Sequence, residues 1–181
     1  GRRRGRGRRP RLGPGGGTRA QKECGIVDST ENMFKYVRAE NNGAVDEATV
    51  RAFCEQSPSN FAWLEDRVKI SFRNDAGRRV FYNKKTSYPP NEATLYMSGN
   101  ESAMPWATLA TPAARGHRCF GDHLTGAAFF NAFLSAVEDH ENIETMYHTK
   151  AEELVMAGSH ACAGVKVVAL PTGEEWIELR A

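Results

Sequence analysis

Hydrophobic residues recur at helical spacing in the first part of the chain. Between a run of capping residues at 28–31 and the stop sequence Asn41-Asn42-Gly43, the apolar positions share one helical face. This pattern predicts a helix over residues 28–39. Asp46 begins a second predicted helix. Ser57-Pro58 begins a third, because proline is tolerated in the first turn of a helix.

A different pattern follows these helices. Residues 68–72 alternate apolar and polar side chains, as a half-buried strand does, and residues 79–82 are its expected hairpin partner across the turn sequence at 74–77. The next stretch, residues 86–114, is rich in Pro, Gly, Ser and Asn. A loop that long in a compact protein is usually functional.

The last third of the chain predicts one helix and several strands. The helix is expected over residues 125–140, where a wide apolar stripe is formed by Phe129, Phe130, Phe133, Leu134 and Val137. A strand at 143–147 is expected next, in a helix-to-parallel-strand step. Apolar runs at 152–156, 165–170 and 176–179 are separated by turn sequences and predict a three-stranded antiparallel meander. The elements together predict a mixed α/β fold.

Charge separates the beginning of the chain from the rest. The 181 residues include 24 Lys and Arg against 22 Asp and Glu, but eight arginines lie within the first 19 residues, so the other sixteen basic residues leave a body with a net charge of −6. Residues 1–14 contain only Gly, Arg, Pro and one Leu, cannot form a core, and are expected to be disordered. An out-of-frame reading of GC-rich DNA is the origin we favour for this run over a genuine tail.

Composition also excludes several classes of protein. The four cysteines are scattered, without a Cys-x-x-Cys pair or a histidine at zinc-ligand spacing, so we expect reduced thiols and no metal site. No run approaches the roughly 18 apolar residues of a membrane span, and no apolar segment follows the charged N-terminus as in a signal peptide. The expectation is a cytoplasmic protein. The arginine run could bind nucleic-acid phosphates, but it has no interleaved aromatic residue and precedes an acidic body, so nucleic-acid binding is only the alternative.

Four blocks of sequence, taken in order, resemble the flavin-dependent fumarate reductase and 3-ketosteroid dehydrogenase superfamily. The blocks are residues 15–25, residues 28–39, residues 96–101 with 115–118, and residues 149–155 leading into 163–167. The resemblance covers about residues 14–181. Two family features have no match: the Gly-x-Gly-x-x-Gly turn that places a pyrophosphate at a helix N-terminus, and a second Gly-rich flavin segment. We therefore expect a truncated fragment that is inactive alone.

The resemblance implies a fold and a division of the chain. The fold would be part of a glutathione-reductase-type FAD-binding domain into which a mainly helical cap segment is inserted. Residues 15–24 would be a loop remnant of the FAD domain and residues 25–122 the cap or substrate segment. Residues 123–181 would return to the FAD-binding domain as helix, strand and meander.

The resemblance also implies residues that bind the cofactor, FAD. Gly16, Gly17 and Thr18 match the loop that lies along the flavin. Ala151 matches the position whose backbone meets the adenine.

A second set of residues would lie on the substrate side. Arg115, His117 and Arg118 take the place of a substrate-side loop, and Tyr96 is expected to face the substrate pocket. Arginine can clamp a carboxylate or a ketone oxygen, and histidine can move a proton near neutral pH. Both arginines could instead be solvated or paired with Asp122. No catalytic residue is assigned.

The implied activity is oxidation or reduction of a carbon–carbon bond beside a carbonyl, with hydride passing between a small-molecule substrate and the flavin. A steroid-like ketone is favoured over a dicarboxylate. Three other readings stay open: a small flavin-binding protein that works without the dinucleotide fingerprint, an Arg/Gly-tailed nucleic-acid-binding protein, and a non-functional truncated product.

Overall fold

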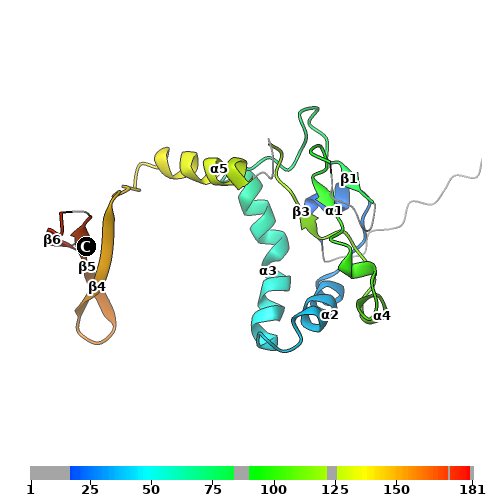
Figure 1. Cartoon of the computed structure of the whole chain (residues 1–181), viewed down its shortest axis with the longest axis horizontal. Helices are drawn as coiled ribbons and strands as arrows, with labels where there is room; N and C mark the ends of the chain where they lie inside the picture. Colours follow the sequence, from blue (N-terminus) through cyan, green and yellow to red (C-terminus); the bar gives the residue numbers. More distant parts are fainter. Residues whose placement is uncertain (1–16, 84–89, 122–125, 171, 180–181) are drawn as a thin grey trace, which may run out of the picture. The chain divides into compact units, whose positions relative to one another are not determined.

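The computed structural model describes residues 17–83, 90–121, 126–170 and 172–179 (Figure 1). The chain forms two compact units, one within residues 1–136 and the other within residues 137–181. The tail expected to be disordered, residues 1–14, lies outside the described residues.

The first unit begins with two capped helices. Helix α1 (Arg19–Glu23) starts at Thr18, and helix α2 (Thr30–Asn41) starts at Ser29, whose side chain accepts a hydrogen bond from the Asn32 amide at 3.0 Å. Helix α2 ends at Asn42, which adopts a left-handed conformation with φ of 49°. The helix predicted over residues 28–39 is therefore confirmed, with both of its ends two residues later in the sequence than predicted.

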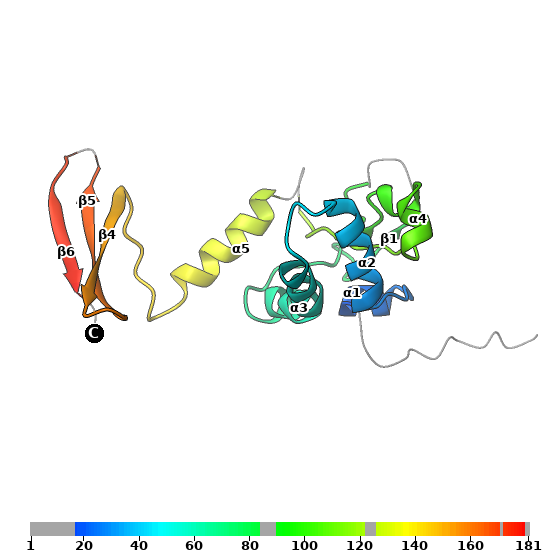
Figure 2. The same ribbon diagram turned by 90° about the horizontal axis from the view of Figure 1, so that it is seen from below.

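Helix α3 (Glu47–Asp66) is a single helix of 20 residues, so the prediction of two separate helices in this region is wrong. Asp46 caps its N-terminus as expected, with a 2.9 Å bond from the Thr49 amide. Pro58 lies inside the helix rather than at a new start, although it cannot donate to the preceding turn. The Ser57 hydroxyl donates to the Phe53 carbonyl at 2.6 Å in that turn, and Phe61 beyond it is buried in the core. Figure 2 shows α2 and α3 side by side, joined by a short loop.

A small sheet carries the segments that matter for the site. Its strands are β1 (Phe81–Tyr82), β2 (Leu95–Tyr96) and β3 (Gly116–His117), in the order β1-β2-β3. Strand β1 runs parallel to β2, and β2 runs antiparallel to β3. A short 3-10 helix, η1 (Asn100–Ser102), and helix α4 (Trp106–Leu109) connect β2 to β3. The long segment between residues 86 and 114 is thus partly ordered into short elements, apart from residues 84–89, which the structure does not describe.

Residues 68–72 alternate as predicted but do not form a strand. Val68, Ile70 and Phe72 are buried, so the alternation correctly predicted which side chains enter the core. The turn at residues 74–78 also forms, with the Gly77 amide donating to the Asn74 carbonyl at 2.8 Å. The predicted hairpin partner pairs elsewhere, because Phe81 and Tyr82 join β2 instead. The hairpin prediction is therefore wrong.

Two hydrophobic clusters hold this unit together. The larger contains Phe61, Phe72 and Cys119, among others, and the smaller contains Phe34, Val50 and Cys54 between α2 and α3. Helix α5 (Gly126–Glu138) confirms the helix expected near 125–140. Residues of α5 that pack against the larger cluster are Ala128, Ala132, Phe133 and Ala136. Phe130 of the predicted apolar stripe is instead 64% exposed.

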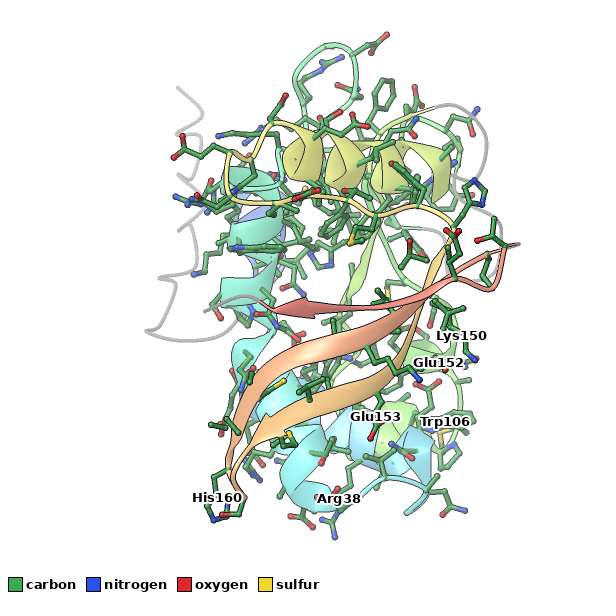
Figure 3. All side chains as sticks on the ribbon, turned by 90° about the vertical axis from the view of Figure 1, so that its left-hand side faces the viewer. Arg38, Trp106, Lys150, Glu152, Glu153 and His160 are labelled. Atoms are coloured by element: carbon green, nitrogen blue, oxygen red, sulfur yellow. The ribbon has the colours of Figure 1, made fainter. Side chains whose placement is uncertain are left out.

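The second unit contains a three-stranded antiparallel sheet in the order β4-β5-β6, as the sequence predicted. Its strands are β4 (Thr149–Ala157), β5 (Ala161–Ala169) and β6 (Glu175–Leu179). Figure 3 shows Lys150, Glu152 and Glu153 along β4, with His160 at the turn into β5. The parallel strand predicted at residues 143–147 is absent from this described segment, which is irregular.

The described chain therefore has mixed helix and sheet content, as the fold-class prediction required. Among the described helices, none is both long and apolar enough to cross a membrane.

Candidate functional site

The site is built around the start of α1. Thr18 and Gln21 form a capping box, in which the Thr18 hydroxyl accepts from the Gln21 amide at 3.2 Å and the Gln21 side-chain oxygen accepts from the Thr18 amide at 2.8 Å. Gly17 precedes this cap with φ of +93°, and a Cβ there would lie 3.1 Å from Gln21 Oε1. The turn into α1 therefore requires glycine at this position.

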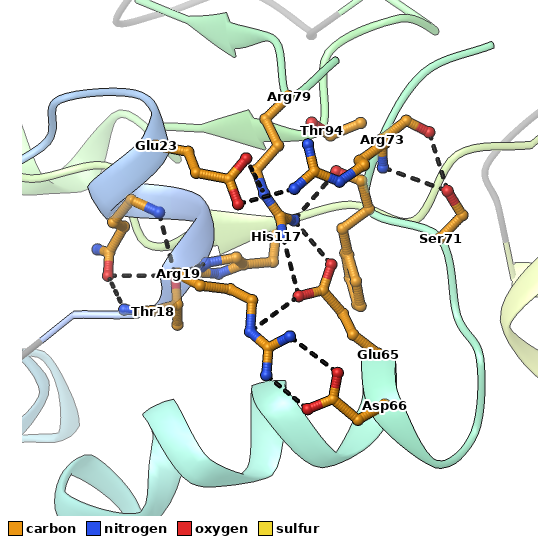
Figure 4. A network of polar contacts seen from close by, with 12 residues as sticks. Thr18, Arg19, Glu23, Glu65, Asp66, Ser71, Arg73, Arg79, Thr94 and His117 are labelled. Carbon is orange, nitrogen blue, oxygen red and sulfur yellow. Dashed lines mark hydrogen bonds and ion pairs between the residues drawn. The ribbon is translucent and has the colours of Figure 1, made fainter. Parts of the chain in front are cut away.

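Two hydrogen bonds tie this turn to a segment almost a hundred residues later in the chain. Gln21 Nε2 donates to the Ala114 carbonyl at 2.7 Å, and Thr18 Oγ1 lies 2.7 Å from His117 Nε2 (Figure 4). Both Thr18 and Gln21 are buried. The fold thus joins the Gly-Thr segment and β3 into one polar cluster.

His117 is held by a second hydrogen bond and by aromatic rings. Its Nδ1 lies 2.8 Å from the Arg115 carbonyl oxygen. The ring packs against Phe61, with centroids 4.6 Å apart, and meets Phe72 edge-on at 6.4 Å. Burial lowers the pKa of His117 below its ordinary value, and the nearby Arg79 charge acts in the same direction, while the hydrogen bond to Arg115 and the charge of Glu65 partly oppose them. The neutral ring is therefore the favoured form in the folded chain.

Arg115 makes a bidentate ion pair with Asp28. Its Nε donates to Oδ2 at 2.7 Å and its Nη2 donates to Oδ1 at 2.9 Å, with side chains only 9% and 3% exposed. Asn32 adds a 2.7 Å bond to Asp28 Oδ1. The guanidinium carbon lies 5.1 Å from the centre of the Tyr36 ring, and the remaining nitrogen, Nη1, is buried without a hydrogen-bond partner among the described residues.

Behind His117, a network of ion pairs surrounds Arg79, whose side chain is 2% exposed (Figure 4). Arg79 Nη1 lies 2.8 Å from Glu65 Oε1, and its Nε lies 3.0 Å from Glu23 Oε2. Arg19 extends the network to Asp66 through a 2.6 Å contact. These contacts connect α1, the end of α3 and the segment before β1.

An apolar pocket of about 290 Å³ opens beside the polar cluster. Gly17, Thr18, Arg115 and His117 are among its lining residues, as are Gln21 and Asp28. Most of the remaining lining is apolar, with Met33, Phe53, Phe61, Leu64, Phe72 and Phe129 among it. The pocket is close to the lower limit of the volumes that small-molecule sites have, and it matches them in character.

The sequence-predicted site residues are only partly brought together. Gly17, Thr18, Arg115 and His117 line one pocket, whereas Tyr96 and Arg118 are not part of its lining. Tyr96 pairs with Gly116 across β2 and β3, so closely that a Cβ on Gly116 would lie 2.6 Å from the tyrosine ring.

The other predicted residues lie elsewhere. Arg118 is buried, and it donates to the Pro90 carbonyl and to Asn91 Oδ1, both at 3.1 Å. Ala151 belongs to β4 of the second unit, opposite Val167 and next to an irregularity in the strand pairing. Gly16 and Asp122 lie outside the described residues.

Sequence reasoning missed two residues of the site, Gln21 and Asp28. The sequence pattern predicts Asp28 to be part of a helix cap, whereas its carboxylate faces Arg115, 87 residues away. A Thr-x-x-Gln spacing at residues 18–21 could have predicted the capping box. No local signal pairs Asp28 with Arg115, because the contact arises only from the tertiary fold.

A family model described as FAD binding domain matches residues 15–181. The chain is 33% identical over 149 residues to a 3-oxo-5-alpha-steroid 4-dehydrogenase of Comamonas testosteroni, covering 80% of this chain and 27% of the relative.

Two solved structures are similar to this one. The 3-ketosteroid-delta4-(5alpha)-dehydrogenase of Rhodococcus jostii RHA1, in complex with 4-androstene-3,17-dione, gives a TM-score of 0.74 at 27% identity, over 90% of this chain and 33% of that one. The open conformation of a flavocytochrome c3 fumarate reductase gives a TM-score of 0.61 at 20% identity, over 93% of this chain and 24% of that one. The chain thus spans between about a quarter and a third of the length of these proteins.

Proposed function

Because the chain belongs to the FAD binding domain family, we propose that it forms part of an FAD-dependent oxidoreductase acting on a carbon–carbon bond beside a carbonyl. Hydride would pass between the substrate and the bound flavin, which supplies the redox chemistry. The observation that carries the proposal is the family match over residues 15–181, to which the 33% identity with a steroid dehydrogenase adds the reaction class. The chain alone is not expected to complete a catalytic cycle.

The residues at the pocket fit one end of such a cofactor. Gly17 lines the pocket and has no side chain, so a ligand can approach its backbone closely. The rest of the lining offers aromatic and aliphatic surface for a ring system. A volume of about 290 Å³ suits a ring system rather than a whole dinucleotide. We therefore assign Gly16, Gly17 and Thr18 to the flavin end of FAD and Ala151 to the adenine end.

The substrate side of the site is proposed to comprise Arg115 and His117, which line the pocket, and Arg118 and Tyr96, which lie outside its lining. Arg115 lines the pocket, and a guanidinium group can donate to a ketone oxygen. A steroid-like ketone is proposed over a dicarboxylate, because the relative that is 33% identical is a 3-oxo-5-alpha-steroid 4-dehydrogenase.

Three further assignments are part of the same proposal. The fold is that of a partial glutathione-reductase-type FAD domain with a mainly helical cap. Residues 15–24 and 123–181 belong to the FAD domain, and residues 25–122 belong to the cap. The protein acts in the cytoplasm.

Titration of FAD with the purified chain tests the proposal. Gly17→Ala and Gly43→Ala form a matched pair, because both glycines have positive φ, +93° and +82°, but only Gly17 lines the pocket. We expect saturable quenching of flavin fluorescence by the wild type and by Gly43→Ala, and binding about tenfold weaker by Gly17→Ala. Absence of binding to the wild type, or equal binding by both variants, contradicts the assignment.

A further inference from the structure

We propose that His117 is a positioning residue. Its Nε2 accepts a hydrogen bond from the Thr18 hydroxyl, and this bond fixes the Gly17–Thr18 segment in the conformation that receives the flavin. The identity of the ligand rests on the proposed function above. The hydrogen-bond assignment within the chain does not depend on it.

The first step is the position of the ring proton. His117 Nδ1 lies 2.8 Å from the Arg115 carbonyl oxygen, which can only accept, so Nδ1 must carry a hydrogen. Burial between Phe61 and Phe72 favours the neutral ring. In a neutral ring with Nδ1 protonated, Nε2 has a lone pair and no hydrogen.

The second step follows at Thr18. Thr18 Oγ1 lies 2.7 Å from His117 Nε2, which carries no hydrogen, and 3.4 Å from Gln21 Oε1. The Thr18 hydroxyl therefore donates its hydrogen to His117. The same oxygen accepts from the Gln21 amide at 3.2 Å. The Thr18 amide donates to Gln21 Oε1, and its carbonyl accepts from the Lys22 amide at 3.1 Å.

Both hydrogens that Thr18 can donate are therefore used inside the chain. A flavin beside this segment would receive no hydrogen from the Thr18 hydroxyl, and the backbone of Gly17 would lie against it. His117 in turn has no hydrogen on Nε2 to give to a substrate. Its role on the substrate side of the site is therefore to hold Thr18, and through Thr18 the preceding glycine.

The arrangement works as a two-point attachment. Gln21 Nε2 on the Ala114 carbonyl is the first point, and Thr18 on His117 is the second. Gly116 lets the backbone between these partners approach the Tyr96 ring, where a Cβ would lie 2.6 Å away. Without the bond from Thr18 to His117, the turn would be attached to residues 114–117 through Gln21 alone.

Two replacements of the histidine separate its hydrogen bonds. His117→Gln places an amide oxygen near the position of Nε2, where it can still accept from Thr18. His117→Asn reaches only the position of Nδ1, so it can still donate to Arg115 but leaves Thr18 without its acceptor. His160→Asn, at an exposed turn, is the control.

Three measurements test the proposal: the tautomer of His117 from long-range proton–nitrogen NMR, hydrogen exchange of the Thr18 amide, and FAD affinity. We expect Nδ1–H with a bare Nε2 in the wild type. In His117→Gln and His160→Asn, the exchange rate of the Thr18 amide and the FAD affinity should both stay within about threefold of the wild type. In His117→Asn, the Thr18 amide should exchange about tenfold faster and FAD should bind about tenfold more weakly.

A hydrogen on Nε2, or equal losses in His117→Asn and His117→Gln, overturns the proposal. If the wild type binds no FAD, the proposed function fails by itself. The tautomer and the exchange rates still decide whether His117 positions Thr18, so the two failures are distinguishable.

Discussion

Asp28 and Arg115 hold each other through two parallel hydrogen bonds of 2.7 and 2.9 Å, although 87 residues separate them in sequence. Both side chains are almost fully buried, so the pair is shielded from solvent. It joins the residue before the α2 cap to the residue before β3. The pair therefore fixes the distance between the N-terminal turn and the strand that carries His117.

Loss of the Asp28 carboxylate should destabilise the first unit. Asp28→Asn leaves the Arg115 charge buried without its counter-charge, and breaking a buried pair in this way costs about 3–5 kcal/mol. Urea unfolding followed by far-ultraviolet circular dichroism measures the loss, since α1, α2 and α3 lie in this unit.

Arg38→Gln is the matched control for Asp28→Asn. Arg38 pairs with Glu47 at 3.2 Å, but the two side chains are 62% and 54% exposed, so the loss should stay below about 1 kcal/mol. Equal losses in the two variants would show that the Asp28–Arg115 pair adds nothing beyond a surface contact.

Gly116→Ala should destabilise the small sheet. A methyl group there would lie 2.6 Å from the Tyr96 ring, and overpacking of this kind costs about 1–3 kcal/mol. Gly126→Ala, where no atom lies within 4 Å of the added carbon, should be neutral or slightly stabilising. Replacing Tyr96 by Leu in the Gly116→Ala background should recover part of the loss, and no recovery would contradict the contact.

Stability should fall with decreasing pH because of His117. Burial lowers its folded-state pKa below the ordinary value of 6.5, with Arg79 adding to the effect and Glu65 opposing it. The unfolded chain then binds a proton that the folded chain does not, so the free energy of unfolding decreases as pH drops from about 7 through the lowered pKa. His117→Gln should flatten the profile in this range. An identical profile in His117→Gln would contradict the assignment.

Removing the Arg79 charge should raise the pKa of His117. The Arg79 guanidinium disfavours a second positive charge nearby, so Arg79→Met relieves that repulsion and leaves Glu65 to favour the charged ring. NMR titration of the His117 ring measures the shift in the folded chain. Arg73→Met is the control, since Arg73 shares Glu23 with Arg79 but its side chain is 41% exposed. A lower pKa in Arg79→Met is the outcome that rules the interpretation out.

Local patterns predicted the helices and the meander well. Capping residues at Ser29 and Asp46 marked the helix starts, and Asn42 marked a helix end, because these signals act within one turn. The alternation at residues 68–72 predicted burial correctly but not strand pairing. Pairing depends on which neighbouring strand is available, and in the folded chain Phe81 and Tyr82 pair with β2.

The site was only partly predictable for the same reason. Thr18, Arg115 and His117 were named from sequence resemblance, and the structure places them in one pocket. The bonds from Thr18 to His117 and from Asp28 to Arg115 span 99 and 87 residues, and no periodicity or local motif reports such contacts. The helix start predicted at Pro58 does not form, because core burial of Phe61 outweighs the helix-starting preference of proline.

The most direct test of the whole account is to map FAD binding residue by residue in amide NMR spectra of the chain. The account predicts that FAD shifts the amide signals of Gly17, Thr18 and His117, and that GTP, a nucleotide without a flavin, leaves these three signals unchanged. Shifts that avoid Gly17, Thr18 and His117, or that GTP reproduces, would contradict the claim that these residues form a flavin site.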